Sequence, residues 1–174
     1  MKILSGDNDV VVKAIARQVG IDTSHFLTGI EIENMDETTL KEAVKDTTLF
    51  SKLTPLQKTQ IISLLQEQGN TVGFLGDGIN DIPAFCESNV GISVDTAVDA
   101  AKDAADVVLL QKDLGVLEQG ILEGRKTFTN MLKYIKITAS SNFGNIFSVV
   151  CASRFLPFLP MTSLQILLLN LLYD

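Results

Sequence analysis

At 174 residues, the chain is long enough for one domain with a sizeable core, and its net charge of −7 argues against nucleic-acid binding. Residues 1–124 hold 9 basic and 20 acidic residues, a net charge of −11, whereas residues 125–174 hold five basic residues and one acidic residue, a net charge of +4. The two cysteines, Cys86 and Cys151, lie in these different parts. We therefore expect no disulfide framework, and a reducing compartment fits the cysteine usage.

In chain order, short apolar runs alternate with helix-type patterns up to residue 110. Apolar strands separated by amphipathic helices predict an α/β fold, with a parallel sheet covered on both faces. The polar stretch 23–34 has no clear pattern and receives no assignment. Strands are expected at residues 1–4, 48–50, 71–75, 90–94 and 107–110, and helices at 12–20, 36–45, 55–69, 80–87 and 96–105.

Beyond Lys136 the pattern changes. Residues 137–153 and 155–173 carry no charge, and each stretch approaches the ~20 residues that cross a bilayer as a helix. Pro157 and Pro160 suit a turn between them, and the basic residues before the first stretch favour a start on the cytoplasmic side. We expect a transmembrane α-helical hairpin. The alternative is a buried pair of helices in a soluble protein.

The most informative motif runs from Gly76 to Asp81, after the expected strand 71–75. Carboxyl ends of parallel strands meet at the ligand-binding edge of such a sheet. Asp77 and Asp81 suit Mg²⁺, which takes one or two carboxylates together with phosphate oxygens and water. A helix beginning at Asn80 offers its amide end to an anion. The alternative is a tight Asp-Gly turn with an Asp helix cap.

Two further segments carry groups suited to phosphate. Ser5-Gly6-Asp7 follows the first strand and offers a hydroxyl and backbone amides, although simple helix capping accounts for it equally well. Lys58 lies near the start of the helix that begins at Pro55, where a cation is unfavourable and a nearby phosphate would explain it. A solvated surface lysine is the alternative reading.

Together these motifs resemble the P-type ATPases of the haloacid dehalogenase superfamily. Ser5-Gly6-Asp7 is similar to that family's Thr-Gly-Asp, Pro55 and Lys58 to its Pro-x-x-Lys, and residues 76–84 to its Gly-Asp-Gly-x-Asn-Asp-x-Pro-Ala. The resemblance implies that Asp77 binds the catalytic Mg²⁺ and that Asp81 supports the site. It also implies that Asn80 and the loop Ser5, Gly6 and Asp7 hold the phosphoryl group, whose charge Lys58 neutralises.

One departure from the family concerns the nucleophile. The family is phosphorylated on the aspartate of Asp-Lys-Thr-Gly-Thr, and this sequence contains no such motif. Asp46-Thr47-Thr48 is the nearest match, but it lacks the lysine and glycine and follows a helix pattern. The actuator domain, the first four spans and the nucleotide-binding domain that mainly binds ATP are also missing. We therefore expect this fragment to be inactive alone.

The expected spans contain polar residues, which are costly in a bilayer and mark ion paths. Asn142 and Asn145 share a face of the first span, and Asn170 and Asp174 share a face of the second. Their oxygen atoms are hard ligands that suit Mg²⁺ or Ca²⁺. Helix–helix hydrogen bonding accounts for the neighbouring serines. By resemblance, Asn145 replaces the glutamate of calcium pumps, and the pattern is most similar to magnesium-importing ATPases.

The sequence thus predicts a partial haloacid dehalogenase-like domain at 1–127 and two transmembrane helices at 128–174, in the plasma membrane with residues 1–127 in the cytoplasm. The expected partners are membrane lipid, the transported Mg²⁺ and the remainder of the pump, with no nucleic acid. Three alternatives stay open: a calcium or other cation pump, a membrane-anchored phosphatase, and a non-catalytic remnant of an interrupted gene. His25 is interpreted as a surface residue.

Overall fold

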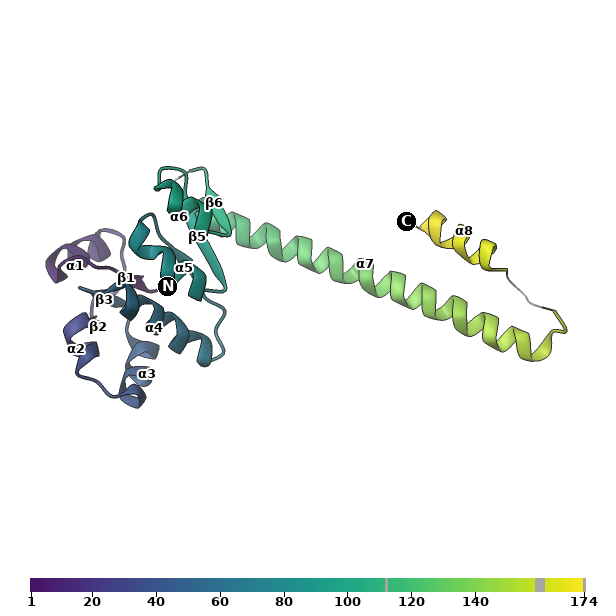
Figure 1. Ribbon diagram of the computed structural model, residues 1–174, viewed down its shortest axis with the longest axis horizontal. Coiled ribbons are helices and arrows are strands. Elements are labelled where there is room, and N and C mark those ends of the chain that lie inside the picture. The colour runs from purple at the N-terminus through teal and green to yellow at the C-terminus, as the bar shows by residue number, and fades with distance from the viewer. Residues whose placement is uncertain (112, 159–161, 174) are drawn as a thin grey trace. The chain divides into compact units, whose positions relative to one another are not determined.

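The computed structural model describes residues 1–111, 113–158 and 162–173. The chain divides into two compact units, Met1–Asp113 and Leu114–Asp174, and each is described separately. The first unit alternates strands and helices, and the second is helical (Figure 1). The strands are β1 (Ile3–Leu4), β2 (Phe26–Thr28), β3 (Leu49–Ser51), β4 (Gly73–Leu75), β5 (Val90–Val94) and β6 (Val107–Leu109). The helices of the first unit are α1 (Asp9–Gln18), α2 (Gly29–Glu33), α3 (Glu37–Asp46), α4 (Pro55–Glu67), the 3-10 turn η1 (Ile79–Asp81), α5 (Ile82–Glu87) and α6 (Asp99–Ala104).

All strand pairs in the first unit are parallel, which confirms the predicted α/β architecture. The strands form two three-stranded sheets, in the orders β1-β3-β2 and β4-β5-β6. Within each sheet, one strand therefore lies in the middle and two form the edges. The strands that precede the two predicted phosphate-site motifs, β1 and β4, are both edge strands.

The core of the first unit is centred on the middle strand β3. Leu49 and Phe50 are completely buried, and β3 is enclosed by residues from α1, α3 and α4. In α1 and α3 the buried apolar residues lie four positions apart, Val12 and Ala16 in one and Leu40 and Val44 in the other, so each of these helices turns one face to the core. The larger cluster comprises Ile32, Leu40, Val44, Phe50, Leu53, Ile61 and Leu64.

Helix starts follow local capping rules. Thr54 caps α4 through a reciprocal capping box with Gln57, and Pro55 occupies the first turn, as its missing N–H allows. The unassigned stretch 23–34 contains β2 and α2. Thr28 and Glu31 form a second capping box there, which starts α2 although the segment is too short and polar to show an apolar period.

The second unit consists of α7 (Leu114–Phe155) and α8 (Ser163–Tyr173). The first expected span, 137–153, lies inside α7, which runs 42 residues without a break. The second expected span, 155–173, contributes α8, and Pro160 lies outside the described residues. Within the three described ranges, no helix combines the length and the apolar character required to cross a membrane.

Candidate functional site

An ion pair joins two of the predicted site motifs. Lys58, in the first turns of α4, places its Nζ atom 2.7 Å from Oδ1 of Asp81, at the end of η1. The two side chains are only 11% and 13% exposed, so the pair is shielded from water and from screening by salt. Helices α4 and α5 pack against each other, and this packing holds the pair together (Figure 1). Lys58 is therefore not a solvated surface lysine.

The turn before Asp81 is shaped around its carboxylate. Oδ2 of Asp81 accepts a hydrogen bond from the backbone N–H of Gly78 at 3.2 Å. A Cβ atom on Gly76 would lie 2.7 Å from the same oxygen and 2.8 Å from the Cβ and Cγ atoms of Asp81. Because real Cβ atoms essentially never approach other atoms this closely, Gly76 is required for Asp81 to occupy this position.

The other two members of the motif face solvent. Asp77 lies in the turn after β4 and Asn80 in η1, and both are exposed. Asp77 thus presents a carboxylate to solvent, as a ligand for Mg²⁺ requires, whereas the carboxylate of Asp81 bonds to Lys58 and Gly78. In the described part of the chain, no group of three or more His, Cys, Asp or Glu side chains is placed to hold a metal ion. Because the Asp81 carboxylate already bonds to Lys58 and Gly78, the exposed Asp77 fits the part of a Mg²⁺ ligand better than Asp81.

The Ser5-Gly6-Asp7 loop closes on itself at the carboxyl end of β1. Oγ of Ser5 accepts a hydrogen bond from the N–H of Asp7 and donates one to Oδ2 of Asp7, both at 3.1 Å. The loop is fastened to the segment after β3, because Lys52 N–H donates to the Asp7 carbonyl at 3.0 Å and Leu53 N–H to the Ser5 carbonyl at 3.1 Å. The cap of α1 is Asn8, not Ser5 or Asp7.

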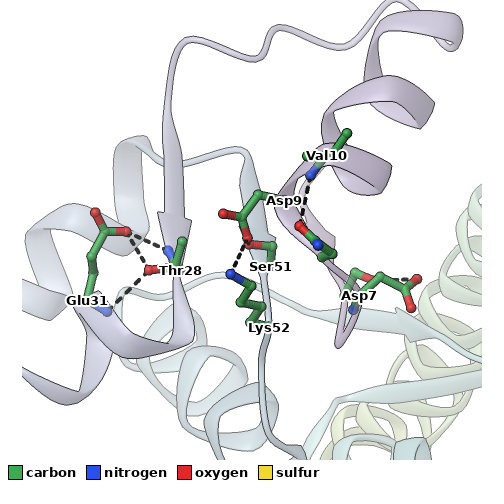
Figure 2. A network of polar contacts seen from close by, with 9 residues as sticks. Asp7, Asp9, Val10, Thr28, Glu31, Ser51 and Lys52 are labelled. Atoms are coloured by element: carbon green, nitrogen blue, oxygen red, sulfur yellow. Dashed lines mark hydrogen bonds and ion pairs between the residues drawn. The ribbon is translucent and has the colours of Figure 1, made fainter.

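Sequence reasoning missed a polar network beside this loop (Figure 2). Ser51, which is completely buried at the end of β3, donates to Oδ1 of Asp9 at 2.9 Å, and Nζ of Lys52 lies 3.3 Å from the same oxygen. The Ser51 hydroxyl is the main cause that lowers the pKa of Asp9, and Lys52 lowers it further. The available signal was the position of Ser51 at the carboxyl end of a buried strand.

The predicted ion-path residues lie in the second unit. Asn142 and Asn145 are both in α7; Asn142 is exposed, and Asn145 is partly buried. Nδ2 of Asn145 is buried and forms no hydrogen bond with any residue that the structure describes. Asn170 belongs to α8, but its side chain and the whole of Asp174 lie outside the described residues. The predicted ion site therefore stays a prediction.

The chain is similar in sequence to one known family and to several characterised proteins. The haloacid dehalogenase-like hydrolase family matches residues 1–88, about half of the chain. Over its full length, the chain is 55% identical to "Magnesium-transporting ATPase, P-type 1" of Salmonella typhimurium and to the protein of the same name in Escherichia coli K12. It is 33% identical to an endoplasmic reticulum calcium ATPase of Aspergillus fumigatus over 99% of the chain. The chain spans 19%, 19% and 18% of the length of these relatives.

A solved structure also resembles the chain. A zinc-transporting PIB-type ATPase in its E2.Pi state is 26% identical and has a TM-score of 0.65, over 87% of this chain and 21% of that one. Together with the sequence matches, it confirms the predicted resemblance to P-type ATPases and the predicted haloacid dehalogenase-like sheets.

Proposed function

The chain belongs to the haloacid dehalogenase-like hydrolase family, and from this premise we propose that it is part of a P-type ATPase that couples ATP hydrolysis to magnesium transport across a membrane. The observation that carries the proposal is the shielded contact between Lys58 and Asp81, which unites two phosphate-site motifs 23 residues apart in the sequence. The 55% identity to magnesium-transporting ATPases over all 174 residues supports the same conclusion.

In this proposal each motif has a separate role. Lys58 presents a positive charge to the phosphoryl group, and the hydrogen bond to Asp81 fixes the position of the Lys58 ammonium group. Ser5, Gly6 and Asp7 form a loop that receives phosphoryl oxygens, and Asn80 contacts the same group from η1. Asp77 holds Mg²⁺, which when bound neutralises phosphate charge during transfer. The remainder of the pump binds most of the ATP.

The sheet arrangement supports an incomplete site. β1 and β4 each carry a phosphate-site motif at the carboxyl end, and each is an edge strand whose outer side pairs with no described residue. Edge strands of parallel sheets are normally covered or paired. A strand from the remainder of the pump, ending in the phosphorylated aspartate, would pair with these edges. The chain would then supply the phosphate-stabilising part of a site whose nucleophile comes from elsewhere.

The membrane part of the proposal concerns residues 128–174, with residues 1–127 in the cytoplasm. Its two uncharged stretches would form a hairpin in the plasma membrane, in contact with lipid, inside the complete pump. Asn145, Asn170 and Asp174 would bind the transported Mg²⁺, with Asn142 beside the path. Nδ2 of Asn145 is buried without a hydrogen bond to any described residue, which leaves a donor for another polar group of the pump, and Oδ1 would be the atom that binds Mg²⁺. A calcium pump is less favoured, because the corresponding identity is 33% rather than 55%.

The proposal is tested in the full-length protein that contains this chain. Asp77→Asn should abolish phosphorylation by ATP. Asp103→Asn, which removes an exposed charge on α6, should leave phosphorylation and its dependence on Mg²⁺ unchanged. Asp174→Ala should abolish magnesium-dependent growth rescue at unchanged expression. Wild-type phosphorylation in Asp77→Asn would contradict the enzymatic part of the proposal. Full growth rescue by Asp174→Ala would contradict its transport part. The genomic sequence upstream should encode Asp-Lys-Thr-Gly-Thr in frame, and its absence would indicate a remnant.

A further inference from the structure

Lys52, directly after β3, has an unusual backbone conformation. Its φ is 51°, in the left-handed region that glycine tolerates and that a long side chain disfavours. Asparagine and aspartate enter this region with the help of local side-chain hydrogen bonds, but lysine has no such acceptor. A residue held in this region points to a constraint imposed by its surroundings and to a use for its side chain.

Three contacts hold Lys52 in place. Its N–H donates to the Asp7 carbonyl at 3.0 Å, which fixes the backbone against the Ser5-Gly6-Asp7 loop. Its carbonyl oxygen packs onto Gly29, where an added Cβ atom would lie only 2.3 Å away. Its Nζ atom lies 3.3 Å from Oδ1 of Asp9 (Figure 2). The ammonium group is thereby directed to the edge of the sheet at which β1 and β3 end.

The ion pair with Asp9 does not by itself explain the strained position. The Lys52 side chain is 44% exposed and that of Asp9 32%, and pairs with this degree of exposure contribute little to stability. Asp9 is moreover fixed independently by the buried hydroxyl of Ser51. Glycine at position 52 would relieve the backbone strain, and a lysine kept there at this conformational cost points to a use for its side chain beyond folding.

We infer that Lys52 is an anion-binding residue. Its ammonium group gives up the ion pair with Asp9 and contacts phosphate oxygens presented at the Ser5-Gly6-Asp7 loop. The inference rests on the proposed function for its ligand class, a phosphate oxyanion. The ammonium group carries three N–H donors on a flexible side chain, so it can reach such a ligand while the Lys52 backbone stays in place. The hydrogen bond to the Asp7 carbonyl holds that backbone. Asp9 holds the ammonium near the loop in the absence of an anion and competes with the anion for it.

The test compares Lys52→Ala, Lys52→Gly and Lys52→Arg in the full chain in detergent, with inorganic phosphate as the probe and ³¹P NMR titration as the measurement. Both Lys52→Ala and Lys52→Gly should weaken phosphate binding about tenfold or more, whereas Lys52→Arg should retain it. Lys52→Gly should also melt about 2–4 °C above Lys52→Ala, because the two differ in backbone strain and not in charge. Lys41→Ala, which removes a surface ion pair with Glu67, is the matched control and should bind phosphate normally.

Asp9→Asn gives a test in the opposite direction. The amide keeps an acceptor for Ser51 but loses the charge that competes for Lys52, so phosphate should bind about two- to fivefold more tightly. If Lys52 were only structural, the same change would leave binding unaltered or weaken it. Tighter binding supports the inference, and either other result overturns it.

A second probe, ATP, shows which phosphate Lys52 contacts and tests the inference separately from the proposed function. In the full-length protein, the Lys52 variants are titrated with ATP. A loss shared by ATP and inorganic phosphate assigns Lys52 to the transferred phosphoryl group and supports the inference, whereas a loss confined to ATP overturns the contact with phosphate at the Ser5-Gly6-Asp7 loop. Normal binding of both probes by Lys52→Ala, or no phosphate binding by the parent chain, overturns the inference. A full-length protein that lacks ATPase activity but shows the Lys52-dependent phosphate binding contradicts only the proposed function.

Discussion

Nζ of Lys58 lies 2.7 Å from Oδ1 of Asp81, although Lys58 follows β3 in one sheet and Asp81 follows β4 in the other. The pair is a polar link between the parts of the first unit that carry the two sheets. Each side chain is nearly buried, so removal of one partner leaves a poorly solvated charge on the other.

A double-mutant cycle should therefore reveal strong coupling between these residues. We expect Lys58→Met and Asp81→Asn each to lower the free energy of unfolding by about 3 kcal/mol, and the double variant to lose less than the sum. Urea denaturation followed by circular dichroism measures the three changes. The same cycle on the exposed pair Lys41 and Glu67 should give a coupling energy below about 1 kcal/mol. Additive losses at Lys58 and Asp81 would show that the contact does not form in solution.

Gly76 should tolerate no side chain. Gly76→Ala would place a methyl group against the Asp81 carboxylate, and such overpacking costs about 1–3 kcal/mol. The variant should also show weaker phosphorylation in the full-length protein, because Asp81 can no longer hold Lys58 in place. Thermal unfolding and phosphorylation by ATP are the two measurements.

Gly73→Ala provides a control on the same strand. A Cβ atom there would meet only Cδ1 of Ile92 and the Val90 carbonyl, both at 3.8 Å, which is ordinary contact. We expect its melting temperature and phosphorylation to lie close to those of the parent. Equal losses in the two variants would indicate a general intolerance of β4 to substitution and would contradict the specific packing of Asp81 on Gly76.

Asp36 should contribute to stability in a pH-dependent way. As the N-cap of α3, its carboxylate accepts hydrogen bonds from Thr38 and Thr39, and the Thr38 hydroxyl is the main cause that lowers its pKa well below the usual range. A group whose pKa is lower in the folded state stabilises the protein above its unfolded pKa, about 4 for Asp, and loses this contribution as the pH falls through the lower folded value. Stability should therefore decline below about pH 4.

Urea denaturation between neutral and acidic pH measures this decline. Asp36→Asn should flatten the acidic limb of the stability curve, since the amide can still cap α3 but does not titrate. Asp103→Asn, which removes a charge from an exposed position on α6, should keep the limb of the parent. An unchanged acidic limb in Asp36→Asn would contradict the role assigned to its hydrogen bonds.

Local sequence signals were sufficient for much of the first unit. The start of α4 could be predicted because Thr54 and Pro55 act through their immediate neighbours. β2 and α2 could not, because they are 3 and 5 residues long and show no apolar period. The separation into two sheets was also not predictable, since sheet order depends on contacts between distant segments.

The candidate site shows the same division. The motifs that contain Lys58 and Asp81 were visible from residue type and spacing, but the ion pair between them depends on the packing of α4 against α5. Lys52 gave no local signal, because the Ser-Lys-Leu sequence contains neither glycine nor asparagine to suggest a positive φ. Its conformation is imposed by Asp7 and Gly29, which come from two other strand ends.

The 174-residue chain alone should hydrolyse no ATP. In the proposed function, Lys58, Asp81 and the Ser5-Gly6-Asp7 loop stabilise a phosphoryl group, but transfer also needs a nucleophile, and the sequence contains no Asp-Lys-Thr-Gly-Thr. Stabilising groups without a nucleophile would bind phosphate without forming a phosphoenzyme. A malachite green assay of purified chain with ATP and Mg²⁺ should give a rate equal to buffer, and radiolabelled ATP should leave no acid-stable label. Phosphate release above buffer that Asp77→Ala abolishes would show that this chain contains a nucleophile after all.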